Sequence, residues 1–407
     1  MPTIPYTWFG GRHGEAASLR GLLAHAGVKH PAGGEALSEP LCFGIAGGIG
    51  AGYSFCPSVI RYGCGSGVSI VGRHFSYSTS GTWYQGACER LGLKTRITET
   101  AATKKAYQNL VDELSAGRPA AVWCARSMLP FMHDIETSCG IWMHSFVIYG
   151  INADKGEAYG SDRAPTPLTI SLPDLAAARA GVCSHKNRTL TIDPPARPLS
   201  AATLKTAIQS GIRACAGELI QGKMKTFSLP GLETLAKMIA NDSSKDGWLK
   251  VYQDGLLYYA LRDAFDSIET AGTGGGLYRN LYADFLAEAA AICKRPSLQT
   301  LAGDYRHLAT GWTELAQSAL PAKIKPFKET RELLVKKRDL FETKGAKADK
   351  QMAEIRAKLR ILGKNTKENF PLDDVESREL LSSMRQRIIA LHRAETELAE
   401  RLAVEGK

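Results

Sequence analysis

Two acid–base side chains, His144 and Asp162, stand at the matching ends of two predicted strands. Residues 145–151 are aromatic and β-branched, and a second strand is predicted over 156–162. Because the chain turns between them, the two strands are expected to pair as a hairpin with His144 and Asp162 side by side. In nucleophilic enzymes a histidine takes the proton of the nucleophile and a carboxylate fixes its tautomer. A single histidine before an apolar strand is usually structural, so it is the joint pattern that favours catalysis.

The position where a nucleophile would stand is Gly14. Residues 10–14 form a tight loop, and apolar residues at helical spacing over 16–26 predict the helix that follows, with Gly27 as its C-cap. A helix N-terminus stabilises a thiolate, so a cysteine enzyme places its nucleophile at such a junction. Glycine has no side chain with which to attack, and this absence is the main difficulty in the sequence.

The order of these elements favours an α+β fold with a papain-like layout, in which the nucleophile position opens the first helix. Further strands are predicted over 120–124 and 189–192, and a helix over 103–116. A proline-rich stretch at 194–198 reads as a linker. We therefore expect the first domain to span residues 1–195.

The remainder of the chain is predicted to be helical. A domain over 200–325 contains helices at 202–220, 231–239, 248–268 and 298–319. Residues 326–407 continue with apolar residues at alternating three- and four-residue steps, interrupted by the polar Glu395. This pattern predicts an antiparallel helical hairpin of coiled-coil type. Its favoured role is packing or oligomerisation, so a homodimer is one alternative.

A glycine-rich stretch over 41–53 invites comparison with a phosphate-binding loop. No Gly-Lys-Ser/Thr sequence follows it, and Tyr53 stands where the third glycine of a dinucleotide-binding motif would be. Close backbone packing or a loop that faces the substrate is the favoured interpretation. We predict no cofactor.

The composition limits the partners that the protein could have. The chain has 407 residues with a formal net charge of +10, which favours acidic partners such as nucleic acid, an anionic membrane or an acidic acyl carrier protein. No basic–aromatic motif supports nucleic-acid binding, and no apolar run is long enough for a membrane span. The nine cysteines are scattered without a Cys-x-x-Cys pair, so neither a metal site nor a disulfide framework is predicted. With no signal peptide, a cytoplasmic location is expected.

The combined motifs resemble the butirosin-biosynthesis protein H family, over about residues 8–320. The resemblance implies a papain-like fold and amide-forming acyl transfer, in the type case from a carrier-protein thioester to an amine of an aminoglycoside. It also implies that the family nucleophile is a cysteine at the position of Gly14. The residues that carry the resemblance are His13-Gly14-Glu15, Leu19, Leu22, Leu23, Gly27, Leu37-Ser38-Glu39, Phe43 to Gly50, Tyr53, His144, Ser161-Asp162-Arg163, Gly276 to Arg279, Tyr282, Phe285, Leu286, Tyr305 and Trp312.

Several explanations of Gly14 remain open. It could be a deliberate substitution that traps a ligand, or the mark of a pseudoenzyme that binds a carrier or a product as a scaffold. Another thiol, such as Cys42, Cys56 or Cys64, could have taken over, although it would need both the helix N-terminus and His144. An amine could also attack a bound thioester directly with His144 as base, more slowly than by covalent catalysis. A peptidase of related fold is a further alternative.

Overall fold

The computed structural model describes residues 3–61, 65–73, 83–134, 143–182, 184 and 186–406 and shows an α+β protein. The chain forms two compact units, and each is assembled from segments that are distant in sequence. The sequence instead predicts three consecutive domains over 1–195, 200–325 and 326–407. The first unit comprises Met1–Cys42, Tyr84–Thr206 and Asp339–Arg356, and the second comprises Phe43–Trp83, Ala207–Arg338 and Ala357–Lys407.

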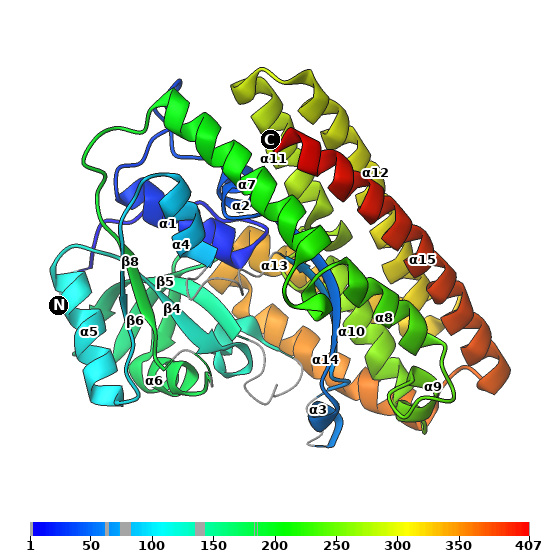
Figure 1. Ribbon diagram of the computed structural model, residues 1–407. Helices are drawn as coiled ribbons and strands as arrows, with labels where there is room; N and C mark the ends of the chain where they lie inside the picture. Colours follow the sequence, from blue (N-terminus) through cyan, green and yellow to red (C-terminus); the bar gives the residue numbers. More distant parts are fainter. Residues whose placement is uncertain are drawn as a thin grey trace. The chain divides into compact units, whose positions relative to one another are not determined.

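The first unit is built on a six-stranded antiparallel sheet, with strand order β3-β8-β4-β5-β6-β7 (Figure 1). The predicted strands over 120–124, 145–151, 156–162 and 189–192 are all present in it. The strands are β3 (Thr95–Thr98), β4 (Ala120–Ala125), β5 (Met143–Asn152), β6 (Glu157–Ser161), β7 (Leu168–Ser171) and β8 (Thr189–Ile192).

Helices cover this sheet, and their apolar faces follow the predicted periodicity. Helix α1 packs on β5 and helix α6 packs on β4. Helix α5 buries Ala106, Leu110, Val111 and Leu114, which is the apolar face expected from the sequence. The helical segments are α1 (Gly14–His25), α2 (Glu39–Ile45), α4 (Trp83–Arg90), α5 (Thr103–Ser115), α6 (Leu172–Ala180), and the short 3₁₀ turns η1 (Arg126–Met128) and η2 (Pro130–Met132).

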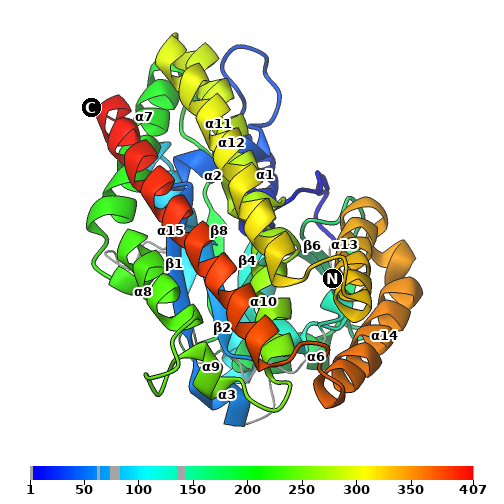
Figure 2. The ribbon, with the colours of Figure 1, turned by 90° about the vertical axis from the view of Figure 1, so that its right-hand side faces the viewer.

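The second unit packs helices around a two-stranded antiparallel sheet. Strand β1 contacts α8 and strand β2 contacts α10, while α11, α12 and α15 lie alongside one another (Figure 2). Its elements are β1 (Ile49–Phe55), α3 (Pro57–Arg61), β2 (Val68–Arg73), α7 (Ala201–Gln221), η3 (Lys225–Phe227), α8 (Leu229–Ile239), α9 (Trp248–Val251), α10 (Leu257–Glu269), η4 (Gly276–Tyr278), α11 (Arg279–Cys293), α12 (Pro296–Ala319), α13 (Lys325–Lys344), α14 (Asp349–Glu368) and α15 (Asp374–Glu405). The 3₁₀ turn η5 (Gly345–Ala348), between α13 and α14, belongs to the first unit. Helices α7, α13 and α14 each cross a unit boundary.

The helix predicted over 248–268 is interrupted. Helix α9 ends at Val251, and α10 begins only at Leu257. Asp254 and Gly255 between them have φ values of 53° and 75°, in the left-handed region that a continuous α-helix does not use. The left-handed turn therefore divides the predicted helix into two.

The antiparallel pairing predicted for the last two helices is not what the structure shows. Both α14 and α15 are present, but α15 makes its extensive contacts with α8 and α12 instead of with α14. A capping box formed by Asp373 and Glu376 starts α15. Its apolar stripe, which includes Leu381, Met384 and Leu391, is buried between two partners of the same unit. A stripe with helical spacing predicts that a face is buried, but not which element covers it.

Glu395, the polar interruption in that stripe, forms a fully buried ion pair. Its Oε1 atom lies 2.7 Å from Arg279 and accepts a second hydrogen bond of 2.7 Å from Trp312 Nε1. Arg279 also donates to the main-chain oxygens of Gly50 on β1 and Gly72 on β2. Glu395 therefore links α15, through Arg279, to the two-stranded sheet of β1 and β2.

The glycine-rich stretch over 41–53 serves close packing, which was the favoured interpretation. A Cβ at Gly44 would lie 2.2 Å from Phe285 Cγ, and one at Gly52 would lie 2.1 Å from the main-chain oxygen of Thr226. Both contacts are far shorter than any side chain allows. Among the described residues, no helix is long and apolar enough to cross a membrane.

Candidate functional site

His144 and Asp162 meet in the first unit, as the hairpin predicts. His144 lies at the start of β5, and Asp162 directly follows β6, which pairs with β5 in antiparallel register. His144 Nε2 lies 2.7 Å from Asp162 Oδ2. The Asp162 side chain is fully buried, whereas 15% of the His144 side chain is exposed. The pair therefore combines a buried carboxylate with an imidazole that solvent can reach.

The surroundings of Asp162 keep it ionised. Burial disfavours the charged carboxylate, but the charge and hydrogen bond of His144, together with Arg163, outweigh burial and lower the pKa of Asp162. An ionised Asp162 accepts the proton on His144 Nε2, which leaves Nδ1 as the nitrogen that can take a proton. The geometry is that of a base held by a carboxylate.

Gly14 faces this pair. It is the first residue of α1 and is buried. A Cβ built on Gly14 would lie 2.8 Å from His144 Cε1 and 3.0 Å from Asp162 Oδ1. The three residues named from the sequence are therefore neighbours, at a helix N-terminus with its partial positive charge. The position that would carry a nucleophile has no side chain.

The loop that leads into α1 is fixed by a buried glutamate that the sequence analysis did not single out. Glu39, the first residue of α2, accepts hydrogen bonds of 2.8 Å from the main-chain nitrogens of Arg12 and His13. His13 then caps the helix, because its Nδ1 accepts from the nitrogen of Ala16 at 3.3 Å. Burial raises the pKa of Glu39, against the opposing effect of these hydrogen bonds and of the Arg12 charge. Glu39 belongs to the motif that carries the resemblance, and this was the only signal for it.

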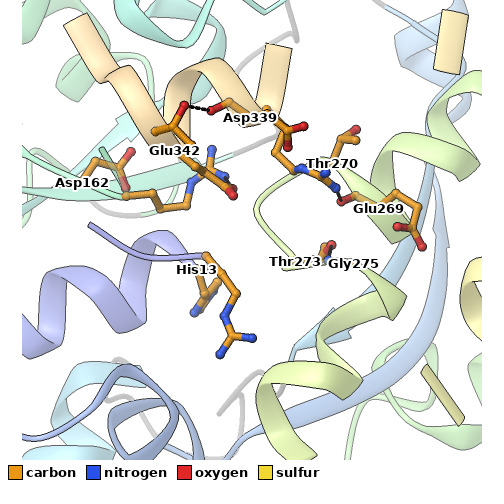
Figure 3. Close-up of polar contacts among 12 residues, drawn as sticks. His13, Asp162, Glu269, Thr270, Thr273, Gly275, Asp339 and Glu342 are labelled. Atoms are coloured by element: carbon orange, nitrogen blue, oxygen red, sulfur yellow. Dashed lines mark hydrogen bonds and ion pairs between the residues drawn. The ribbon is translucent and has the colours of Figure 1, made fainter. Parts of the chain in front are cut away.

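The loop before α1 is also hydrogen-bonded to the residue that follows Asp162. The main-chain nitrogen of Gly11 donates to the main-chain oxygen of Arg163 at 2.9 Å. Gly10 has a φ of 67°, a conformation that glycine adopts readily. Figure 3 shows His13 at the start of α1 and Asp162 on the neighbouring strand segment.

The cysteines considered as replacement nucleophiles lie in different parts of the chain. Cys42 is buried on α2, Cys56 belongs to the second unit, and Cys64 lies outside the described residues. The thiol that does neighbour His144 is Cys124, its cross-strand partner on β4. Burial raises the pKa of Cys124 to about 12, so this thiol stays protonated at neutral pH.

Within the part of the chain that the structure describes, no group of three or more His, Cys, Asp or Glu side chains could hold a metal ion. The chemistry that the arrangement itself supports is proton transfer by His144, oriented by Asp162, next to the hydrogen-bond donors of a helix N-terminus.

Two family models match parts of this chain. Residues 173–340 match a domain of unknown function, DUF4872. No curated protein matches the chain. Residues 13–163, which contain Gly14, His144 and Asp162, match the N-terminal domain of butirosin biosynthesis protein H. The N-terminal part of the chain therefore belongs to the butirosin biosynthesis protein H family.

Proposed function

We propose that this protein forms amides by acyl transfer, moving an acyl group from a carrier-protein thioester to an amine in specialised metabolism. The first unit would be a papain-like domain of acyltransferase type. The observation that carries the proposal is the 2.7 Å contact between His144 and an ionised, fully buried Asp162 next to residue 14. A buried charge is costly unless it is paired and hydrogen-bonded, and ionisable groups with shifted pKa values concentrate at active sites.

The reaction can proceed without a covalent intermediate. The amine nitrogen attacks the thioester carbonyl carbon while His144 Nδ1 takes a proton from the amine. Main-chain N–H groups at the start of α1 stabilise the negative charge that develops on the carbonyl oxygen. The carbon–sulfur bond then breaks, and the leaving thiolate takes the proton from His144. The products are an amide and a free carrier thiol, and Gly14 takes no part as a nucleophile.

The proposed partners are an acidic acyl carrier protein and an amine-bearing small molecule. The chain has 51 Lys and Arg residues against 41 Asp and Glu, and this excess suits an acidic carrier. A cytoplasmic location agrees with such a donor. A peptidase of related fold would need the nucleophile that is absent at Gly14, which counts against that alternative.

A second candidate function is that of a pseudoenzyme that binds a carrier or product without turnover. One observation favours it. The His144 ring stands where the side chain of a nucleophile would begin, because a Cβ at Gly14 would lie 2.8 Å from His144 Cε1. The space at the site is thus adapted to glycine.

An assay with small substrates separates the two functions. The full chain is mixed with an acyl-pantetheine thioester and a panel of primary amines, and amide formation is followed by mass spectrometry. We expect amide from the unaltered chain, no acyl group attached to the protein, and a loss of roughly 100- to 10,000-fold in His144→Ala. His307→Ala, an exposed histidine on α12, serves as the control. Thioester binding without amide, or equal rates in His144→Ala, would overturn catalysis in favour of the pseudoenzyme.

A further inference from the structure

Arg163 is buried and connects the candidate site to three parts of the first unit. Its positive charge helps to lower the pKa of Asp162, the preceding residue. Its main-chain oxygen holds Gly11 in the loop before α1, at 2.9 Å. Its guanidinium NH1 donates to Glu342 Oε1 at 2.8 Å. Arg163 therefore contacts both halves of the site, and Glu342 is the anchor of its side chain.

Glu342 comes from a segment that lies far along the chain. It stands near the end of α13, in the portion from Asp339 to Arg356 that belongs to the first unit. The neighbouring Phe341 lies under the guanidinium, with 5.0 Å between Arg163 Cζ and the ring centroid. Figure 3 shows Glu342 and Asp162 on adjacent elements.

Further contacts dock the segment from Asp339 to Arg356 on the first unit. Phe341 stacks on Phe131, with ring centroids 6.5 Å apart. Asp349 Oδ1 lies 2.7 Å from His133 Nε2. Phe341 and Glu342 follow residue 340, where the second family match ends, so this anchor lies outside both matched regions.

We propose that Glu342 is a positioning residue of the His144–Asp162 pair: it fixes the side chain of Arg163, which in turn holds Asp162 and the loop before α1. The contacts are present whatever reaction the protein performs, and only their role in catalysis rests on the proposed function. The segment around Glu342 thus extends the candidate site beyond the part of the chain that the family describes.

Glu342 acts through Arg163 and not directly. The charges of His144 and Arg163 lower the pKa of Asp162, whereas a carboxylate such as Glu342 could by itself only raise it. Burial raises the pKa of the Tyr84 hydroxyl on α4, and the Asp162 charge adds to this effect. If Glu342 is removed, the Arg163 side chain loses its anchor and its cationic charge becomes free to move away from Asp162.

The test follows the Asp162 carboxyl carbon by NMR as the pH is lowered, with the signal assigned by Asp162→Asn. Glu342→Ala should move the Asp162 pKa upward, and Arg163→Gln should move it further in the same direction. Glu342→Gln keeps a hydrogen-bond acceptor for Arg163 and should shift the pKa less than Glu342→Ala. A direct charge effect of Glu342 would have the opposite sign, because loss of a nearby negative charge lowers the pKa of a carboxyl group.

Two comparisons make the result decisive. Glu342→Ala should add no shift in an Arg163→Gln background, because its effect runs through Arg163. Asp193→Asn, which removes the carboxylate of the exposed Arg96–Asp193 pair, should leave Asp162 unchanged. An unchanged or lowered Asp162 pKa in Glu342→Ala would overturn the proposal.

A second measurement is used if a variant unfolds in acid before its Asp162 is protonated. At pH 8 the ¹⁵N signals of the His144 ring report its tautomer, and the proton should stay on Nε2 while Asp162 is held in place. Glu342→Ala should mix the two tautomers, whereas Asp193→Asn should not, and a single tautomer in both would contradict the proposal. Neither readout depends on turnover, so a failed acyl-transfer assay would leave this inference intact.

Discussion

Two ion pairs with a fully buried carboxylate, Arg279–Glu395 in the second unit and His144–Asp162 in the first, are built differently. In the second unit, Arg279 and Glu395 are both fully buried, and Arg279 also donates to the main-chain oxygens of Gly50, Gly72 and Leu277. In the first unit, Asp162 is fully buried but its partner His144 remains partly exposed, and His144 Nε2 lies 2.7 Å from Asp162 Oδ2.

The Arg279–Glu395 pair is suited to holding the fold together, whereas the His144–Asp162 pair is suited to acid–base chemistry. Arg279 uses its donors to join strands and helices, and a guanidinium does not lose its proton in proteins. The imidazole of His144 can act as an acid or a base, and its second ring nitrogen is left for a substrate. A buried carboxylate alone therefore does not mark a site, whereas a titratable and accessible partner does.

The largest effect should come from breaking the structural pair. Glu395→Ala leaves the buried Arg279 charge unpaired and should lower the free energy of unfolding by about 3–5 kcal/mol, measured by denaturant unfolding. Glu314→Ala removes the carboxylate of the exposed Arg387–Glu314 pair and should cost less than about 1 kcal/mol. Similar losses in the two variants would erase the distinction between the buried pair and an ordinary surface pair.

A smaller effect, visible only in acid, should come from Asp162. Its pKa in the folded protein lies below the usual value, which is about 3.9 in an unfolded chain. The ionised carboxylate therefore stabilises the fold at higher pH, and this contribution is lost as the pH falls through the folded-state pKa. The stability difference between the natural sequence and Asp162→Asn should shrink when urea unfolding is repeated from pH 6 downward. A difference independent of pH would show that Asp162 is not held ionised.

Local patterns predicted the strands and the meeting of His144 with Asp162, because a hairpin needs only neighbouring sequence. Glu39 and Glu342 were missed, since each reaches the site from a separate segment and looks like an ordinary surface glutamate in the sequence. The partners of α15 were missed for the same reason. Glu395 was noticed as an interruption, but its partner Arg279 lies 116 positions away.

The central claim is that His144 and Asp162 form a working base directed at the start of α1. Gly14→Cys tests it without knowledge of the substrate. The new Cβ displaces the His144 ring slightly, and the thiol should then be deprotonated by the helix N-terminus and the imidazole. The alkylation rate of Cys at position 14 by iodoacetamide at pH 6, followed by peptide mass spectrometry, should be roughly tenfold or more above that in Gly14→Cys/His144→Ala. Equal rates in the two variants would contradict the account.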